Sequence, residues 1–132
     1  MSEEIIYGTQ QFPTEIKQQN DAKQVIIAWD TGESFTYSME YLRVMCPCAD
    51  CRGHHPSQKK LIFGKKGVGI TAITPVGHYA VKIAFDDEHS SGVFSFENLY
   101  DLGKNHDEHW EEYLVELKAG GKSRMMWNIT QA

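Results

Sequence analysis

The stretch that organises this chain is Cys46-Pro47-Cys48-Ala49-Asp50-Cys51. It contains all 3 cysteines of the protein, and they lie too close together to form a disulfide framework between distant segments. Reduced, clustered thiols fit a reducing compartment and are typical of a metal site, because zinc and iron bind thiolate ligands. Pro47 stiffens the turn that the short spacing between Cys46 and Cys48 requires. We therefore predict that this stretch binds one metal ion.

A fourth ligand must come from elsewhere in the chain, because a structural zinc site needs four protein ligands. His54 and His55 are nearest but lie in a basic loop, whereas His89 lies on a polar turn between two predicted strands. On spacing alone, His89 is best explained as an exposed turn residue. Asp87 or Glu88 beside it could also supply an oxygen ligand or accept a hydrogen bond from a ligand. The histidine candidates at this point are His54, His55, His78, His89, His106 and His109.

The sequence before the cysteines predicts strands followed by a short helix. Residues 13–17 predict a first strand, and 25–29 form a β-rich apolar run that stops at the turn sequence 30–33. Residues 34–37 predict the returning strand. Ser38 can cap a helix that leads directly into the cysteine stretch. The apolar positions of that helix recur at three-residue spacing, at Met39, Leu42 and Met45.

The sequence after the cysteines predicts a long loop and then a β-meander. Residues 52–69 are rich in Gly, Pro, His and Lys, and we assign them no regular structure beyond an apolar anchor at 61–63. Strands are predicted at 70–76, 79–85 and 93–94. The turns between them are predicted at 77–78 and 86–92. The apolar positions of the middle strand alternate, at Tyr79, Val81, Ile83 and Phe85.

Two helices complete the predicted elements. Ser95 can cap a helix that runs through Leu102 and ends at Gly103. The last helix is predicted at 106–119, with a capping box at its start, an apolar stripe, and a stop at Gly120. The capping box pairs Asn105 with Glu108. The apolar stripe comprises Trp110, Tyr113, Leu114 and Leu117.

These elements predict one small α+β domain over residues 1–132. Its core spans about 14–102, and its C-terminal helix spans about 106–119. Without repeated strand–helix–strand crossovers, we expect an antiparallel β-sheet with short helices packed on or beside it and one metal site. A chain of 132 residues with 41% hydrophobic content has enough apolar surface for a single core.

The charge of the chain limits its partners and its location. A formal net charge of −5 argues against general attraction to nucleic acid or to anionic membranes. The acidic N-terminus lacks a secretory signal, and no apolar run has the length of a membrane span, so we expect a cytoplasmic protein. The basic residues of the loop favour a solvated surface over nucleic-acid binding, because Phe63 is the only aromatic among them. These basic residues are Arg52, Lys59, Lys60, Lys65 and Lys66.

The cysteine stretch and its surroundings resemble a known family. Leu42-Arg43 followed by the segment 46–52, together with Trp29-Asp30-Thr31-Gly32, resembles the gamma-butyrobetaine hydroxylase-like N-terminal domain family. Residues 76–83, 87–89 and 92–99 resemble the block that supplies the histidine ligand of that family. The similarity spans roughly 14–102, and its specific part is the CPCxxCR element.

The resemblance implies a zinc site of three cysteines and one histidine. Residue by residue, that site corresponds to Cys46, Cys48, Cys51 and His89 in this chain. Where the family usually has Trp-x-Asp-Gly-His, Phe85 replaces the tryptophan and Glu88 replaces the glycine. In some proteins of the family the domain precedes a 2-oxoglutarate-dependent oxygenase domain, and in others it is fused to P-loop ATPases that carry iron–sulfur clusters. For this chain we expect a stand-alone domain without the oxygenase domain.

We therefore predict a non-catalytic metal-binding domain that acts as a structural or protein-interaction module. The predicted cofactor is Zn²⁺ and the expected partner is another protein, while the sequence does not distinguish a monomer from a weak dimer. The alternative is an iron or iron–sulfur cluster accessory protein. Thiol redox catalysis is not favoured, because reactive cysteines lie at helix N-termini and these follow a predicted helix. The segment 106–108 resembles part of an iron triad, but a solvated helix start explains it better.

Overall fold

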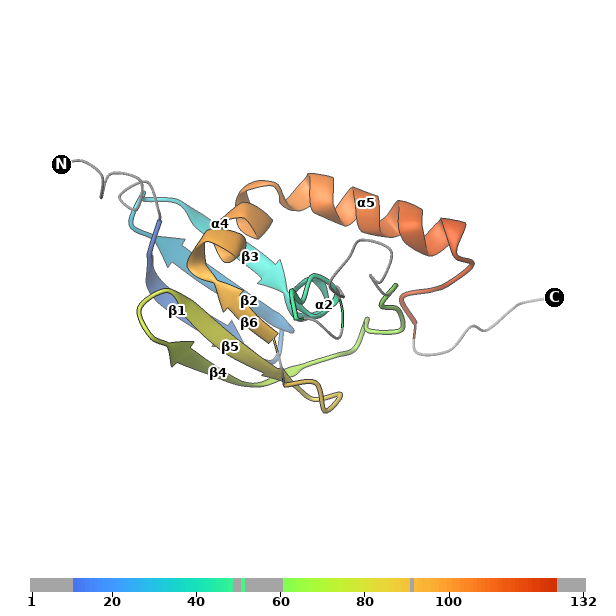
Figure 1. Cartoon of the computed structure of the whole chain (residues 1–132), viewed down its shortest axis with the longest axis horizontal. Helices are drawn as coiled ribbons and strands as arrows, with labels where there is room; N and C mark the ends of the chain where they lie inside the picture. Colours follow the sequence, from blue (N-terminus) through green and yellow to red (C-terminus); the bar gives the residue numbers. More distant parts are fainter. Residues whose placement is uncertain (1–10, 49–50, 52–60, 91, 126–132) are drawn as a thin grey trace.

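The computed structural model describes residues 11–48, 51, 61–90 and 92–125. They form two antiparallel sheets of three strands each, with helices packed beside them (Figure 1). The predicted α+β class is confirmed, with the strands divided between two sheets. Among the described residues, no helix has the length and apolar content that crossing a bilayer would require.

The first sheet is built from the N-terminal part of the chain, with strand order β1-β2-β3. Ile16 of the first strand lies opposite Ile27 of the second, and Val25 of the second lies opposite Tyr37 of the third. The middle strand alternates buried and half-buried residues, as a strand with one face on the core should. The strands are β1 (Pro13–Gln19), β2 (Gln24–Trp29) and β3 (Ser34–Ser38).

The second sheet follows the predicted meander, with strand order β4-β5-β6. Val81, Ile83 and Phe85 are buried as the alternation predicted. The prediction for Tyr79 is wrong, because residues 77–79 form the turn and the Tyr79 side chain is 60% exposed. Gly77 allows this turn through its positive φ of 57°. The strands are β4 (Ile70–Val76), β5 (Ala80–Phe85) and β6 (Gly92–Ser95).

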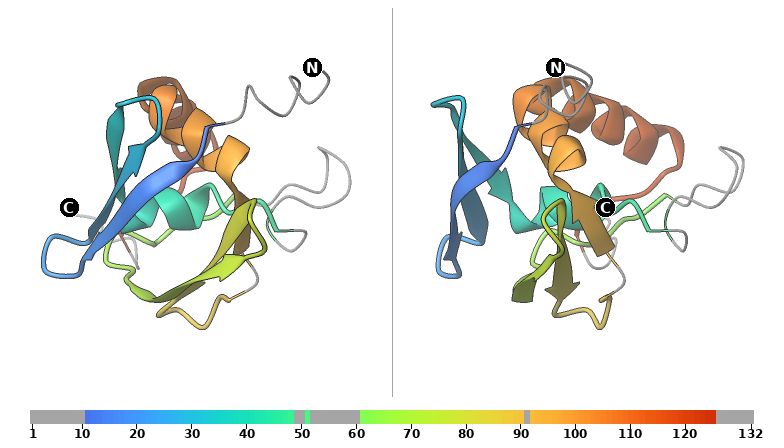
Figure 2. Two further views of the ribbon diagram at one scale, coloured as in Figure 1. Left: turned by 90° about the vertical axis from the view of Figure 1, so that its left-hand side faces the viewer. Right: turned by 60° about the vertical axis from the view of Figure 1, so that its left-hand side comes forward.

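The short helix α2 (Met39–Val44) lies near the centre of the molecule, beside both sheets (Figure 2). Ser38 caps it as predicted, because its Oγ accepts a hydrogen bond of 2.9 Å from the backbone N–H of Tyr41. Every residue of the helix is buried, including the charged Glu40 and Arg43. A helix this short depends on its tertiary packing. Its buried position fixes where the cysteine stretch begins.

Helix α4 (Phe96–Lys104) packs on β3 of one sheet and β6 of the other. Ser95 caps it as predicted, with its Oγ 3.0 Å from the backbone nitrogen of Asn98. The predicted end at Gly103 is wrong, since the helix continues to Lys104. A Cβ atom on Gly103 would lie 2.5 Å from Oη of Tyr37. This glycine therefore permits close packing of the helix on β3.

Helix α5 (His106–Ala119) has the predicted bounds, but its start is not a capping box. Asn105 makes no side-chain cap hydrogen bond, and its amide instead donates to Oδ1 of Asp101 at 2.8 Å. The helix stops at Gly120 as predicted, and the left-handed conformation follows at Gly121, with φ of 67°. Figure 1 shows α5 extending along one side of the molecule, above the sheets.

The described part of the predicted loop, residues 61–69, contains no helix or strand, as expected. Leu61 and Ile62 pack against the core, and Tyr113 of α5 donates a hydrogen bond of 2.7 Å to the carbonyl of Ile62.

Two further buried tyrosines connect helix α4 to β3 and to α2 by hydrogen bonds. The hydroxyl of Tyr37 donates to Leu99 and that of Tyr41 donates to Leu102, both at 2.7 Å. These bonds fix α4 over β3 and α2.

Candidate metal centre

One residue, the helix cap Met45, separates the first cysteine from α2. The backbone N–H of Cys46 donates to the carbonyl of Arg43 at 3.3 Å, which continues the turn beyond the helix. The side chain of Cys46 is fully buried, and a Cβ atom on Gly92 of β6 would lie only 3.0 Å from its sulfur. Gly92 therefore makes room for this thiol. The N–H of Cys51 donates to the carbonyl of Cys48 at 3.1 Å.

His89 lies on the turn between β5 and β6. The N–H of Phe85 donates to the carbonyl of His89 at 2.8 Å, and Oδ1 of Asp87 accepts a hydrogen bond of 3.3 Å from the N–H of His89. Glu88 adopts a positive φ of 67°, a conformation that glycine favours. The turn therefore has the conformation that a glycine would favour, although a glutamate stands there.

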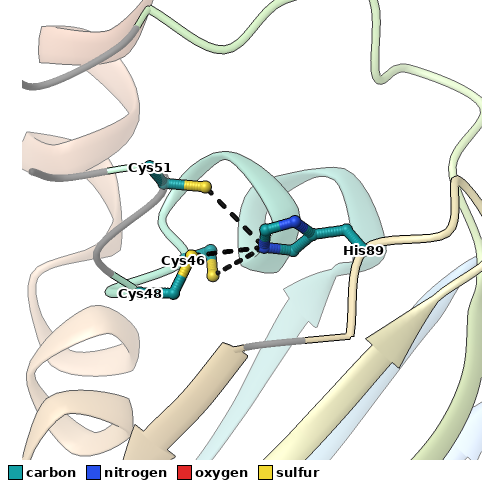
Figure 3. A group of neighbouring side chains, drawn as sticks. All are labelled: Cys46, Cys48, Cys51 and His89. Atoms are coloured by element: carbon teal, nitrogen blue, oxygen red, sulfur yellow. Dashed lines mark hydrogen bonds between the residues drawn. The ribbon is translucent and has the colours of Figure 1, made fainter.

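Figure 3 shows the imidazole of His89 pointing into the space between the three thiol groups. Its Nε2 lies 3.2 Å from Sγ of Cys46, 3.4 Å from Sγ of Cys48 and 3.7 Å from Sγ of Cys51. An imidazole nitrogen takes part in one good hydrogen bond at a time, so three sulfurs around one nitrogen are not explained by hydrogen bonding. Four donor atoms converging on one point are typical of a bound ion. We call these residues, Cys46, Cys48, Cys51 and His89, the Cys3His group.

The spacing of the Cys3His group fits a single tetrahedral ion. Zinc–sulfur and zinc–nitrogen bond lengths with tetrahedral angles give nitrogen–sulfur separations of about 3.6 Å and sulfur–sulfur separations of about 3.8 Å. The observed nitrogen–sulfur separations of 3.2–3.7 Å bracket the first value. All four donor atoms lie within 4.8 Å of one another. The group can therefore hold a metal ion with small side-chain rotations.

The surroundings of two of the thiols raise their pKa values. Burial raises the pKa of the Cys46 thiol well above its ordinary range. Burial and a hydrogen bond with Cys48 also raise the pKa of Cys51, against a smaller opposing effect of Arg43. Reactive cysteines instead have lowered pKa values, because the thiolate is the nucleophile. A metal ion would have to displace the protons of these thiols when it binds.

A charged network lies against the Cys3His group. Nη1 of the buried Arg43 donates to Sγ of Cys51 at 3.5 Å, and Nε of Arg43 donates to Oδ2 of Asp87 at 2.8 Å. Nζ of Lys65 donates to the same oxygen of Asp87 at 2.6 Å. Burial opposes the charge on Asp87, but its hydrogen bonds with Lys65 and Arg43 lower its pKa overall. The charged side chains of Arg43, Asp87 and Lys65 therefore lie next to the thiols.

The other histidines considered from the sequence lie away from this group or outside the described residues. His78 is exposed on the turn at the opposite end of β5. His106 lies beside Trp110 and pairs with Asp107, and Nε2 of His109 lies 2.9 Å from Oδ2 of Asp101. His54 and His55 fall outside the described residues, as do Arg52, Lys59 and Lys60 of the basic loop.

The structure also places two acidic candidates and reveals two residues that the sequence did not single out. Asp87 accepts hydrogen bonds next to the group without joining it, and Glu88 is exposed. Arg43 contacts Cys51 from the end of α2, and Gly92 lies against Cys46 from the start of β6. The resemblance of the Leu42-Arg43 pair to the family pattern was the only available signal for Arg43.

Comparison with known proteins identifies the family and the fold of the chain. The family model described as "Gamma-butyrobetaine hydroxylase-like, N-terminal" matches residues 16–100. No curated protein gives a significant match. One solution NMR structure aligns with a TM-score of 0.79 and 35% identity, covering 93% of this chain and 97% of that chain. A second NMR structure aligns with a TM-score of 0.74 and 42% identity, covering 92% and 91%.

A crystal structure from Acidithiobacillus ferrooxidans is also similar. It shows a protein of unknown function that belongs to the DUF971 family. The alignment has a TM-score of 0.59 and 34% identity, and it covers 69% of this chain and 91% of that chain. The family match spans strands of both sheets. The chain belongs to the gamma-butyrobetaine hydroxylase-like N-terminal domain family.

Proposed function

We propose that the Cys3His group binds one zinc ion and that the protein is a non-catalytic domain stabilised by it. The observation that carries the proposal is the convergence of three sulfurs on one imidazole nitrogen at 3.2–3.7 Å. Three thiolates and one imidazole complete a tetrahedron and leave no position for a substrate. Bound zinc would therefore supply folding free energy and join the segment after α2 to the turn between β5 and β6.

The same spacing favours one ion over an iron–sulfur cluster. In a cluster the protein ligands are divided between two or more irons, so their donor atoms are spread further apart than around one ion. Donor atoms that all lie within 4.8 Å suit a single metal. A cluster or a single iron ion is the alternative, and the first experiment separates it from zinc.

Metal content tests the proposal most directly. Protein purified without oxygen is analysed for its elements, and the absorbance spectrum of the same sample is recorded. We expect one zinc per chain in the wild type and its loss, or at least 10-fold weaker binding, in His89→Ala. His78→Ala is the matched control, because this histidine is exposed at the other end of β5. It should retain the metal fully.

Each other outcome has a definite meaning. A folded wild-type chain without metal contradicts the proposal, as does a His89→Ala variant with undiminished zinc. Iron together with visible cluster absorbance would contradict the zinc proposal and support the iron–sulfur alternative. If the histidine variant does not fold, Cys48→Ala provides the same test at a half-buried ligand.

We further propose that the domain acts through a surface that binds another protein, with no chemical step at the metal. A metal with four protein ligands has no position for a substrate, so its role is structural. The function of the domain is then to present the surface that the metal holds in place. Cobalt-substituted protein tests the non-catalytic part. Its visible spectrum should stay unchanged when small anions such as azide are added, whereas a new band would reveal an open coordination position.

A further inference from the structure

The buried arginine of α2 is the most unusual side chain near the Cys3His group. Arg43 has only 8% of its side chain exposed, although its charge is permanent. A buried charge is costly unless its hydrogen bonds are satisfied, so its position requires an explanation. Its guanidinium lies with Cζ 6.0 Å from the ring centre of Phe85, the residue that precedes the histidine turn. Arg43 therefore lies between the two halves of the site, which are the cysteine stretch after α2 and the turn that carries His89.

The hydrogen bonds of Arg43 reach both halves. One guanidinium nitrogen donates to Sγ of Cys51, and another donates to Asp87, whose second oxygen accepts from the backbone of His89. The planar guanidinium can make both bonds at once because its donors have a fixed geometry. Lysine has a single charged nitrogen and cannot span both partners in the same way.

From this geometry we propose that Arg43 is a positioning residue of the metal centre, which holds Cys51 and, through Asp87, the turn of His89 in the arrangement that binds the ion. This inference rests on the proposed function, since it assigns Arg43 a role at that metal. Residues that hydrogen-bond to metal ligands orient them, and their loss typically lowers metal affinity by about 10- to 100-fold.

Charge supplies a second reason for an arginine here. Three thiolates around a divalent ion leave one net negative charge in a largely buried site. Arg43 provides one positive charge next to Cys51, while Lys65 and Asp87 balance each other at 2.6 Å. A hydrogen bond to a thiolate sulfur also stabilises its lone pairs. Removing the donor should therefore lower the energy of the sulfur-to-metal charge-transfer transition.

The test compares Arg43→Met and Arg43→Lys with the wild type, using zinc and cobalt(II) as probes. Zinc affinity is measured by competition with a chelator, and the charge-transfer band is recorded on the cobalt-loaded proteins. We expect about 10- to 100-fold weaker zinc binding and a red-shifted band for Arg43→Met. Arg43→Lys should recover part of the affinity, because it restores the charge without the second hydrogen bond.

Arg124→Met is the matched control. Arg124 also forms an ion pair with a buried carboxylate, at 2.7 Å from Glu40, but it does not donate to a cysteine of the site. This variant can lose stability but should keep the band energy of the wild type. A folded Arg43→Met protein with wild-type affinity and an unshifted band overturns the inference.

A second variant covers the case in which Arg43→Met does not fold. Asp87→Asn keeps the size of the side chain but removes the charge that holds Arg43. We expect weaker zinc binding here too, and unchanged binding overturns the inference. Failure of the proposed function looks different, because the wild type itself would then bind neither zinc nor cobalt.

Discussion

At the scale of single residues, Glu88 shows how this chain departs from its family without losing the geometry of the site. Its φ of 67° lies in the left-handed region, where a side chain with a Cβ atom is strained by about 1 kcal/mol or more. The turn keeps this conformation through two hydrogen bonds of His89. Its backbone N–H donates to the carboxylate of Asp87, and its backbone carbonyl accepts from the N–H of Phe85. The strain is thus offset by hydrogen bonds on both sides.

Glu88→Gly should therefore stabilise the folded protein. We expect a gain of about 1 kcal/mol, because glycine adopts positive φ without steric cost, although it also gains freedom in the unfolded chain. This corresponds to a rise of about 4 °C in the midpoint of thermal unfolding of the metal-loaded protein. Glu88→Ala is the control, since it removes the same carboxylate but keeps Cβ. A rise with alanine equal to that with glycine would assign the effect to charge instead.

At the scale of elements, a polar contact joins the turn between β2 and β3 to helix α4. Nζ of Lys104 lies 2.7 Å from Oε2 of Glu33, and the hydroxyl of Tyr100 donates to the other carboxylate oxygen. The hydrogen bond from Lys104 is the main cause that lowers the pKa of Glu33 from 4.5 to about 2, and Tyr100 adds to it. A lowered pKa means that the ionised carboxylate stabilises the fold.

The contribution of Glu33 should therefore depend on pH. Its stabilisation is fully present above pH 4.5 and is lost as the pH falls toward 2, because the unfolded chain binds the proton first. Glu33→Gln should unfold at a lower temperature than the wild type at neutral pH. The difference between the two proteins, followed by thermal unfolding, should shrink below pH 4.5. A difference that is independent of pH would show that the charge is unimportant.

Most elements of the fold could be predicted from the sequence because they rest on local patterns. Ser38 and Ser95 cap their helices as expected, and the turn after β2 ends that strand where predicted. The errors arise where tertiary contacts decide. Asn105 finds a partner in Asp101, and Gly103 is required by the proximity of Tyr37, which no local pattern reveals.

The candidate site was predictable to a similar degree. The clustering of the cysteines is visible in the sequence itself, whereas the resemblance to the family was needed to select His89 among the six histidines. Arg43 could not be found in this way, since its role depends on Cys51 and Asp87 meeting at one point in space. Its position in a short helix gives no hint of its burial.

At the scale of the whole molecule, two sheets share one core and meet at α2 and α4. Helix α4 contacts both sheets, and Gln18 of β1 donates a hydrogen bond of 3.0 Å to Ile70 of β4. A metal ion bound by the Cys3His group would add a further link, between the segment after α2 and the second sheet. Contacts of α4 do not depend on the metal. We therefore expect a bound ion to strengthen the packing of the two sheets. The contacts of α4 and the hydrogen bond of Gln18 should hold the sheets together without it.

Removal of the metal by a chelator should lower the thermal stability of the wild type. With free zinc at a hundred times its dissociation constant, binding contributes about 3 kcal/mol, so this is the expected loss. Circular dichroism with and without chelator measures it, and hydrogen exchange should increase first in the turn between β5 and β6. The His89→Ala variant should show a much smaller change. An equal change in both proteins would mean that the chelator acts elsewhere.

The unequal burial of the ligands determines how the ion would enter and leave. Cys46 and Cys51 are covered by the core, whereas Cys48 and His89 are half-exposed. An incoming chelator or metal-donating protein therefore meets the Cys48–His89 edge first. Exchange would proceed stepwise from that edge, with the two inner thiolates as the last to release the ion. A bound ion would thus exchange slowly in the folded chain and would leave rapidly when the chain unfolds.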